Sequence, residues 1–124
     1  MDGIIKIRYT NDELIYEKNK SGYETWKKFD VNNNLIYFKD SHKYECWYMY
    51  DEKGNRIQYL DNTGFRIWFE YNEYGKLIHY RDSRQYEFWN VFDSDGTLIK
   101  KYDNLENIVK IWGDFIWMKF IFIQ

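Results

Sequence analysis

The sequence predicts an all-β protein, an elongated, curled antiparallel β-hairpin repeat array of about ten or eleven short strands. Four tryptophans recur at a spacing of 21 residues, at Trp26, Trp47, Trp68 and Trp89. An aromatic side chain lies three residues before and three residues after each of them, and a [DN]-x-x-[GN] segment follows. A fixed period of this length is typical of repeat proteins rather than of a domain with one conventional core.

Other positions repeat with the same period over about residues 9–106, so the unit can be written W-x-x-[FY]-[DN]-x-x-[GN]-x-[LR]-I-x-x-x-[DN]-x-x-x-[YF]. An isoleucine column contains Ile15, Ile36, Ile57, Ile78 and Ile99. A second acid or amide column contains Asn19, Asp40, Asp61, Asp82 and Asp103. We expect these acids and amides to be turn residues, because their side chains hydrogen-bond to backbone amides just ahead of them.

Each repeat contains two segments that favour strands. Leu35–Lys39 and Tyr44–Tyr50 are rich in β-branched and aromatic residues. Turn segments follow them at Asp40–Lys43 and Asp51–Gly54, where glycine, or Asn33 in an equivalent turn, supplies the left-handed conformation. The chain has no proline, so every strand residue can donate a ladder hydrogen bond. Each repeat therefore predicts two antiparallel strands joined by two different turns.

The alternation of side chains along a strand sorts these residues between two faces. In the longer strand Tyr44, Cys46, Tyr48 and Tyr50 share one face, and Glu45, Trp47 and Met49 share the other. The face without tryptophan is richer in apolar residues, and we expect it to be the core side of a curled sheet. The other face presents a ladder of tryptophans between charged neighbours.

Composition and chain ends favour one domain, residues 1–124, in the cytoplasm. The formal net charge is −2, and Cys46 is the only cysteine, which suits a reducing compartment. The first residues lack the features of a signal peptide. The apolar run Phe115–Ile123 is too short to span a bilayer as a helix. It predicts a C-terminal strand that covers a sheet edge, either as a cap or by pairing in a homodimer.

The repeat resembles a known family. Tyr50–Ile57 (YDEKGNRI), Asp61–Gly64 (DNTG) and Tyr71 look like a YD repeat of the Rhs type, and the likeness covers about residues 9–106. The resemblance implies β-hairpin repeats, which in that family form spiralling shells. A weaker likeness exists to choline-binding cell-wall repeats, but their Gly-Trp pairs are missing here. Other copies depart from the YD pattern at Asn33, Lys43, Asn72 and Gln85.

The chemistry of the sequence argues against an enzyme and against a metal or another cofactor. His42 and His79 are the only histidines, and neither has a partner at metal-ligand spacing. No phosphate-binding loop or nucleophile motif is present. We expect Asp51 and Asp93 to shape turns, Cys46 to be a packed small side chain, and His79 to face solvent.

The tryptophan column has two interpretations, which are cross-strand packing and a binding face. The candidate partner-binding residues are Trp26, Trp47, Trp68, Trp89, Glu24, Glu45, Glu87 and Tyr37. We expect a protein partner, such as a nuclease or toxin, which makes the chain a small inhibitor or immunity protein, including a phage anti-defence protein such as an anti-CRISPR. The alternative is a carbohydrate or cell-wall binding module. Nucleic acid is not expected, because single strands need a positive groove, and neither is a membrane.

Overall fold

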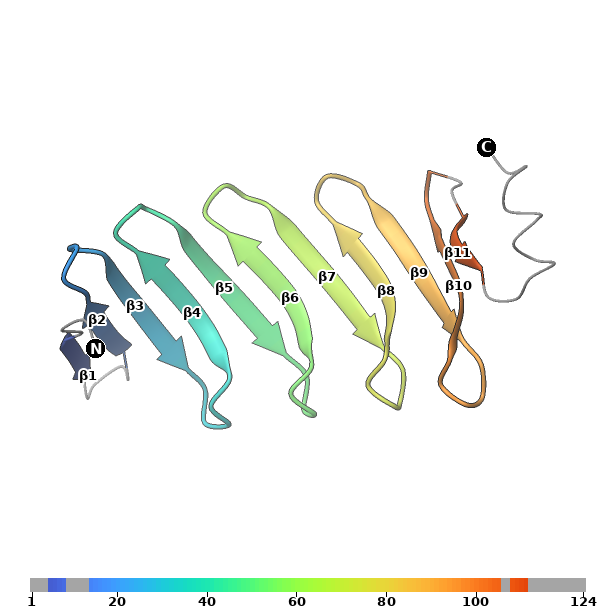
Figure 1. The fold of residues 1–124 in the computed structure, drawn as a ribbon, viewed down its shortest axis with the longest axis horizontal. Coiled ribbons are helices and arrows are strands. Elements are labelled where there is room, and N and C mark those ends of the chain that lie inside the picture. Colours follow the sequence, from blue (N-terminus) through green and yellow to red (C-terminus); the bar gives the residue numbers. More distant parts are fainter. Residues whose placement is uncertain (1–4, 9–13, 106–107, 112–124) are drawn as a thin grey trace. The chain divides into compact units, whose positions relative to one another are not determined.

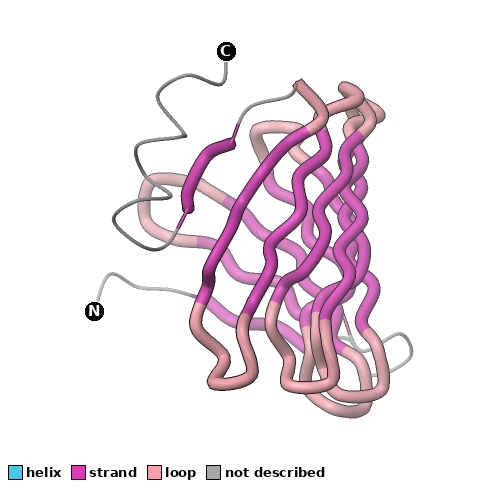
Figure 2. The backbone as a smooth tube through the Cα atoms, turned by 90° about the vertical axis from the view of Figure 1, so that its right-hand side faces the viewer, coloured by secondary structure: helices cyan, strands magenta, loops and turns pink. Residues whose placement is uncertain are grey.

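The computed structural model describes residues 5–8, 14–105 and 108–111, and in 5–8 and 108–111 it describes only the backbone. These residues form eleven β-strands and no helix (Figures 1 and 2). They confirm the predicted all-β array of sequential hairpins. The chain divides into two compact units, Met1–Arg66 and Ile67–Gln124. The predicted C-terminal strand at residues 115–123 lies outside the described residues.

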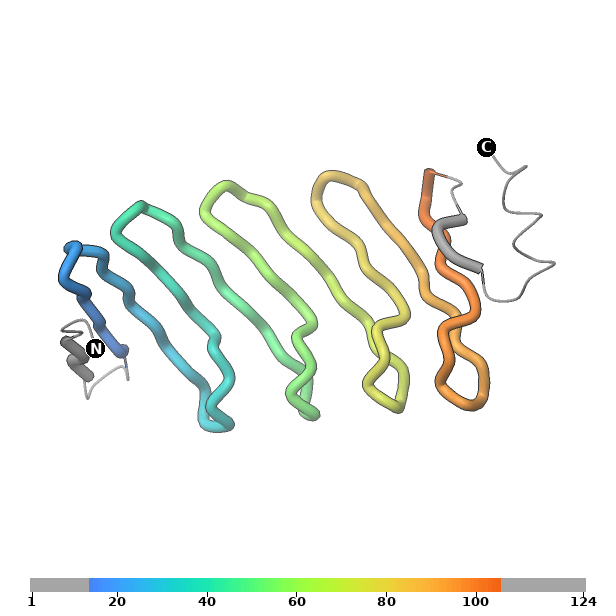
Figure 3. Tube along the Cα trace, in the orientation of Figure 1, coloured from blue at the N-terminus to red at the C-terminus, as the bar shows by residue number. Residues whose placement is uncertain are grey.

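Unit 1 contains six strands that meander in chain order, each antiparallel to the one before it (Figure 3). They are β1 (Ile5–Arg8), β2 (Leu14–Lys18), β3 (Glu24–Phe29), β4 (Leu35–Asp40), β5 (Glu45–Tyr50) and β6 (Arg56–Asp61). The strands predicted at Leu35–Lys39 and Tyr44–Tyr50 are β4 and β5, each correct to within one residue at its ends.

Unit 2 repeats the same meander with antiparallel neighbours. Its strands are β7 (Arg66–Tyr71), whose first residue is the last of unit 1, β8 (Leu77–Asp82), β9 (Glu87–Phe92), β10 (Leu98–Asp103) and β11 (Ile108–Ile111). The spacing of equivalent strands from β4 to β6 and from β8 to β10 is the sequence period, so the 21-residue repeat is one β-hairpin.

The turns at both ends of the strands use one hydrogen-bond pattern, although two different turns were predicted. At Asp30 the amide donates to the carbonyl of Asn34, and the carboxylate accepts from the amides of Asn32 and Asn34. Asp40 makes the equivalent bonds at the opposite end. Each of these turns closes through a residue with positive φ. These residues are Gly22, Asn33, Lys43, Gly54, Gly64, Gly75, Gln85 and Gly96.

The two ends of the hairpins differ in how they join their neighbours. Next to the turns that begin at Asp51 and its equivalents Asp30, Asn72 and Asp93, the strand register shifts by one residue, as between Met49 and Tyr50. At the other end, the residue after the turn acid bonds to the preceding repeat: Asn62 donates its amide to the carbonyl of Glu45, 2.9 Å away. The side chain of Asn62 also accepts from the amide of Glu45. Adjacent repeats are thereby tied at one end of the sheet.

Neither face of the sheet is the enclosed core that the sequence analysis expected on the side without tryptophan. Among residues 14–105, Cys46 is the only hydrophobic residue that is buried. Most strand side chains on both faces are half-buried, because each is covered by cross-strand neighbours rather than by a second layer. The prediction that Cys46 is a packed small side chain is confirmed. Stability therefore depends mainly on contacts between adjacent strands.

Candidate functional site

The tryptophans lie on one face of each unit, which we call the Trp face. In unit 1 it carries Tyr16, Glu24, Trp26, Tyr37, Lys39, Glu45, Trp47, Met49 and Leu60, and in unit 2 it carries Trp68, Glu70, His79, Arg81, Glu87, Trp89, Val91 and Tyr102. These assignments follow from the strand register, because directly opposite residues share a face and neighbours along a strand alternate.

In unit 1 each tryptophan packs against a tyrosine on the preceding strand. The ring centroids of Tyr16 and Trp26 are 5.3 Å apart, and those of Tyr37 and Trp47 are 5.8 Å apart. On its other side Trp26 is opposite Lys39, whose Nζ lies 5.5 Å from the ring centroid. These contacts support the packing interpretation, because they fix the indole rings within the sheet.

The glutamates of unit 1 are hydrogen-bonded to the same tyrosines. The hydroxyl of Tyr37 donates to Glu45 Oε2 at 2.5 Å, and Tyr16 donates to Glu24 in the equivalent way. Partial burial of the phenol, together with the bond to Glu45, raises the pKa of Tyr37 to about 12. The predicted residues Glu24, Tyr37 and Glu45 are therefore part of the Trp face, and their orientations are fixed by cross-strand bonds.

Trp47 and Met49 form the apolar surface of β5 that solvent reaches most easily. Trp47 is 39% exposed and Met49 is 53% exposed. The residue opposite Trp47 on β6 is Leu60, whereas Lys39 occupies the corresponding position beside Trp26. A leucine covers less of the indole than a long cationic side chain does. The centre of the Trp face in unit 1 is therefore an exposed aromatic and thioether pair with a fixed backbone beneath it.

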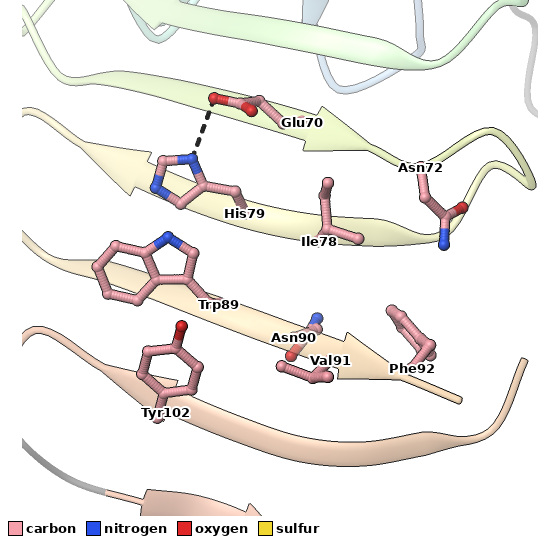
Figure 4. Close-up of a pocket in the computed structure, with 9 residues that line it drawn as sticks. All are labelled: Glu70, Asn72, Ile78, His79, Trp89, Asn90, Val91, Phe92 and Tyr102. Carbon is pink, nitrogen blue, oxygen red and sulfur yellow. Dashed lines mark hydrogen bonds and ion pairs between the residues drawn. The ribbon is translucent and has the colours of Figure 1, made fainter. Parts of the chain in front are cut away.

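In unit 2 the tryptophans are covered on their ring faces. The guanidinium of Arg81 lies 4.4 Å from the ring centroid of Trp68. Trp89 lies between His79 and Tyr102, with centroids 5.2 Å away on both sides and ring planes inclined by 10° and 16°. Figure 4 shows these three rings in a row on adjacent strands, along an open groove of about 410 Å³ that Glu70 and Val91 also line.

His79 lies on the open Trp face, but its side chain is only 19% exposed, so neighbouring side chains cover it more than the sequence predicted. Its Nδ1 lies 3.1 Å from Glu70 Oε1 and its Nε2 lies 2.6 Å from Glu87 Oε2. Partial burial opposes the charged ring, but the two carboxylates outweigh it and raise the pKa of His79. This cluster was not predicted from the sequence, because nothing in the repeat pattern marked Glu70 as a neighbour of His79.

The turn acids have structural partners, as predicted. Asp51 accepts from the amides of Lys53 and Asn55, and Asp93 accepts from those of Asp95 and Thr97. The hydrogen bonds from Asn55 lower the pKa of Asp51. Within the described part of the chain, no group of His, Cys, Asp and Glu side chains is arranged to hold a metal ion.

The second acid column is bound at its turns by tyrosine hydroxyls as well as by backbone amides. The carboxylates of this column that accept from a tyrosine are those of Asp40, Asp61, Asp82 and Asp103. No sequence motif pointed to these tyrosine partners, two of which lie seventeen residues away along the chain and two of which lie two residues away.

The structure thus places the predicted site residues in two groups. Glu24, Trp26, Tyr37, Glu45 and Trp47 lie together on the Trp face of unit 1, whereas Trp68, Glu87 and Trp89 lie on that of unit 2. Met49, Glu70 and His79 belong to the same face but were not predicted as site residues. Alternation along β5 and β7 was a usable signal for Met49 and Glu70, since each lies two residues after a tryptophan.

No protein-family model matches this chain, and no curated protein matches it either. Among the residues with described structure, no helix is long and apolar enough to cross a membrane. The geometry of the Trp face is therefore the basis on which a function can be argued.

Proposed function

We propose that this chain is a protein-binding module and that its contact surface is the Trp face of unit 1, centred on Trp47 and Met49. The observation that carries the proposal is the joint exposure of these two side chains, 39% and 53%, on one strand. Tryptophan and methionine are enriched at protein interfaces, and tryptophan is among the residues that most often dominate binding energy.

The surroundings of this pair suit a protein interface. Tyr37 packs against Trp47 and is itself held by its bond to Glu45, so these side chains lose little conformational freedom on binding. Glu45 and Lys39 lie opposite each other at one end of the pair and supply charges of both signs at its rim. An apolar centre with a polar rim is the usual anatomy of a specific interface.

The covered ring faces favour a protein partner over the alternative, a carbohydrate. A sugar stacks on an open aromatic face, but Trp89 has a ring on each side and Trp68 has a guanidinium over it. A regular platform of stacked sugars would need the same open face in every repeat. A protein partner needs only one exposed anchor, which Trp47 and Met49 supply.

The finer part of the proposal is that binding blocks the partner, as an inhibitor or immunity protein does, in the cytoplasm. A rigid, extended face of side chains acts by covering a surface and needs no chemistry of its own. The resemblance to YD repeats adds the suggestion that hairpin repeats of this kind serve as a scaffold for such a face. The partner class proposed is a nuclease or a toxin.

Replacing Met49 with Asp is expected to abolish capture of the partner from a lysate of the source cells, because it places a charge in the centre of the interface. Val31→Asp is the matched control, since Val31 is also apolar and is 97% exposed, but lies in a turn. The measurement is quantitative mass spectrometry of proteins retained by wild type and both variants, followed by an activity assay of the retained partner.

The supporting result is a protein retained by wild type and Val31→Asp, lost with Met49→Asp, and inhibited when the wild-type chain is added. Equal retention by both variants, with equal melting temperatures, would place the binding site elsewhere. A polysaccharide retained instead of a protein, and lost in the same variant, would replace this proposal with the carbohydrate alternative.

A further inference from the structure

The position of His79 in the repeat is occupied by Tyr16, Tyr37 and Gln58 in unit 1 and by Lys100 in the next repeat of unit 2. Tyr16 and Tyr37 each donate a hydroxyl hydrogen to a glutamate eight residues later, Glu24 and Glu45. His79 makes the corresponding contact with Glu87, also eight residues later. Compared with the two tyrosine copies, His79 keeps the cross-strand bond but replaces a group that is neutral at physiological pH with one that titrates there.

The histidine also contacts a carboxylate on the preceding strand. Its Nδ1 lies 3.1 Å from Glu70 on β7, while its Nε2 lies 2.6 Å from Glu87 on β9. A neutral imidazole carries one N–H and donates to one carboxylate only, whereas an imidazolium donates to both. With both nitrogens at hydrogen-bond distance from carboxylate oxygens, the ring can donate to both only when it is protonated.

We propose that His79 is a pH-sensitive clasp in unit 2, which joins β7 and β9 across β8 when it is protonated and releases Glu70 when it is not. The clasp depends on the contacts above and does not require that the Trp face binds a partner. It also predicts how the charge of the groove in Figure 4 changes with pH.

The charges around the ring favour this assignment. Two carboxylates, Glu70 and Glu87, contact it directly, and Trp89 stacks on it with centroids 5.2 Å apart. The nearest cation on its own strand, Arg81, lies over Trp68. Lys100 on β10 lies over Tyr102, beyond Trp89. Partial burial opposes the charged ring, but the glutamates dominate, and the pKa of His79 is raised.

The contact with Glu70 is the one that opens. Glu70 has a side chain that is 67% exposed, against 27% for Glu87, and its distance to the ring is the longer of the two. After proton loss the remaining N–H stays on Nε2 and donates to Glu87, as the hydroxyl of Tyr37 does to Glu45. Because the ring has lost its positive charge and the Glu70 carboxylate is free, the groove beside Trp89 and Tyr102 then carries a more negative charge.

The raised pKa fixes the direction of the effect on stability. The clasp makes its full contribution to the free energy of unfolding below the ordinary histidine pKa of 6.5. This contribution is lost as the pH rises through the raised pKa of His79 in the folded state. The melting temperature of the full chain should therefore fall as the pH rises above about 6.5.

The test is a two-dimensional NMR titration of the histidine ring signals in the full chain, with melting temperatures measured over the same pH range. His42, in a turn and without a glutamate contact among the described residues, provides a second signal in the same sample. We expect a His79 pKa above 6.5 in wild type, and a lower value in Glu70→Gln. In His79→Tyr, which introduces the residue found at this position in the repeats of Tyr16 and Tyr37, the decline of the melting temperature above about pH 6.5 should disappear.

A wild-type His79 pKa at or below 6.5 would overturn the clasp. So would an unchanged His79 pKa in Glu70→Gln, which would show that Glu70 does not hold the proton. A His79→Tyr variant whose melting temperature keeps the wild-type pH profile would assign that profile to other groups. The NMR readout stands even if one variant folds poorly, because the wild-type titration alone can refute the proposal.

Discussion

Deleting residues 37–57, one full repeat, is expected to leave a folded β-protein. Deleting residues 37–56 should prevent stable folding, so that no cooperative unfolding transition is observed. The first deletion joins Ile36 to Gln58, and Ile36 then takes the place of Ile57 in the same column. The hybrid strand pairs with β3 as β4 does now. Because each hairpin contacts only its neighbours within unit 1, removing one brings two equivalent surfaces together.

The shorter deletion is the matched control, since it differs by one residue. It leaves Ile36 followed by Ile57, and every side chain after that point changes face. Tyr59 and Asp61, which bond to each other, would then move together to the opposite face, away from their present cross-strand neighbours, and the strand would need a bulge to recover. Far-UV circular dichroism and thermal melting of both proteins measure the difference. Identical behaviour of the two deletions would show that the repeats are not equivalent structural units.

Replacing Asp82 with Ala should lower the free energy of unfolding by about 3 kcal/mol, since it leaves several donors without their acceptor. The buried Asp82 carboxylate accepts from the amides of Arg84 and Tyr86 and from the hydroxyl of Tyr80. Asp93→Ala is the matched control, because Asp93 accepts two amides in the same turn pattern but is exposed. Its donors are hydrated after the change, so the loss should be clearly smaller.

Chemical denaturation of wild type and both variants measures the two losses. Equal losses of unfolding free energy in the two variants would mean that the bond from Tyr80 and the burial of Asp82 add no stability beyond that of the turn. A loss at Asp82 confined to a fraction of a kcal/mol would contradict the account of the second acid column as a structural element.

The strands and turns were predictable from sequence because their causes are local. The spacing of Trp26 and Trp47 fixes the repeat, and alternation along β5 fixes which side chains share a face. The acids at positions 30 and 51 bond to amides two and four residues ahead, and such contacts can be read from the sequence. The same reasoning identified Asn33 as a left-handed residue, with φ of 67°.

The features that sequence reasoning missed depend on register between strands. Asn62 bonds to Glu45 across a separation of 17 residues, and His79 meets Glu70 across the β7–β8 hairpin. No single column of the repeat carries this information.

The exposure of Trp47 also depends on the residue opposite it on the next strand. Trp26 is opposite Lys39, Trp68 is opposite Arg81 and Trp89 is opposite Tyr102. At the same position beside Trp47 the chain has Leu60, which is too short to cover the indole. One substitution in an otherwise regular array thus separates the proposed anchor from the packed tryptophans.

The central claim, that the Trp face of unit 1 binds a protein, is tested most directly by the affinity of Trp47→Ala for the purified partner, with its melting temperature measured in parallel. The expected result is an affinity at least roughly 30-fold weaker, which corresponds to about 2 kcal/mol for a hot-spot residue. The melting temperature should fall only modestly, because Trp47 is already partly exposed to solvent. An unchanged affinity, or a loss fully accounted for by the unfolded fraction, would contradict the claim and make the tryptophan column a packing element alone.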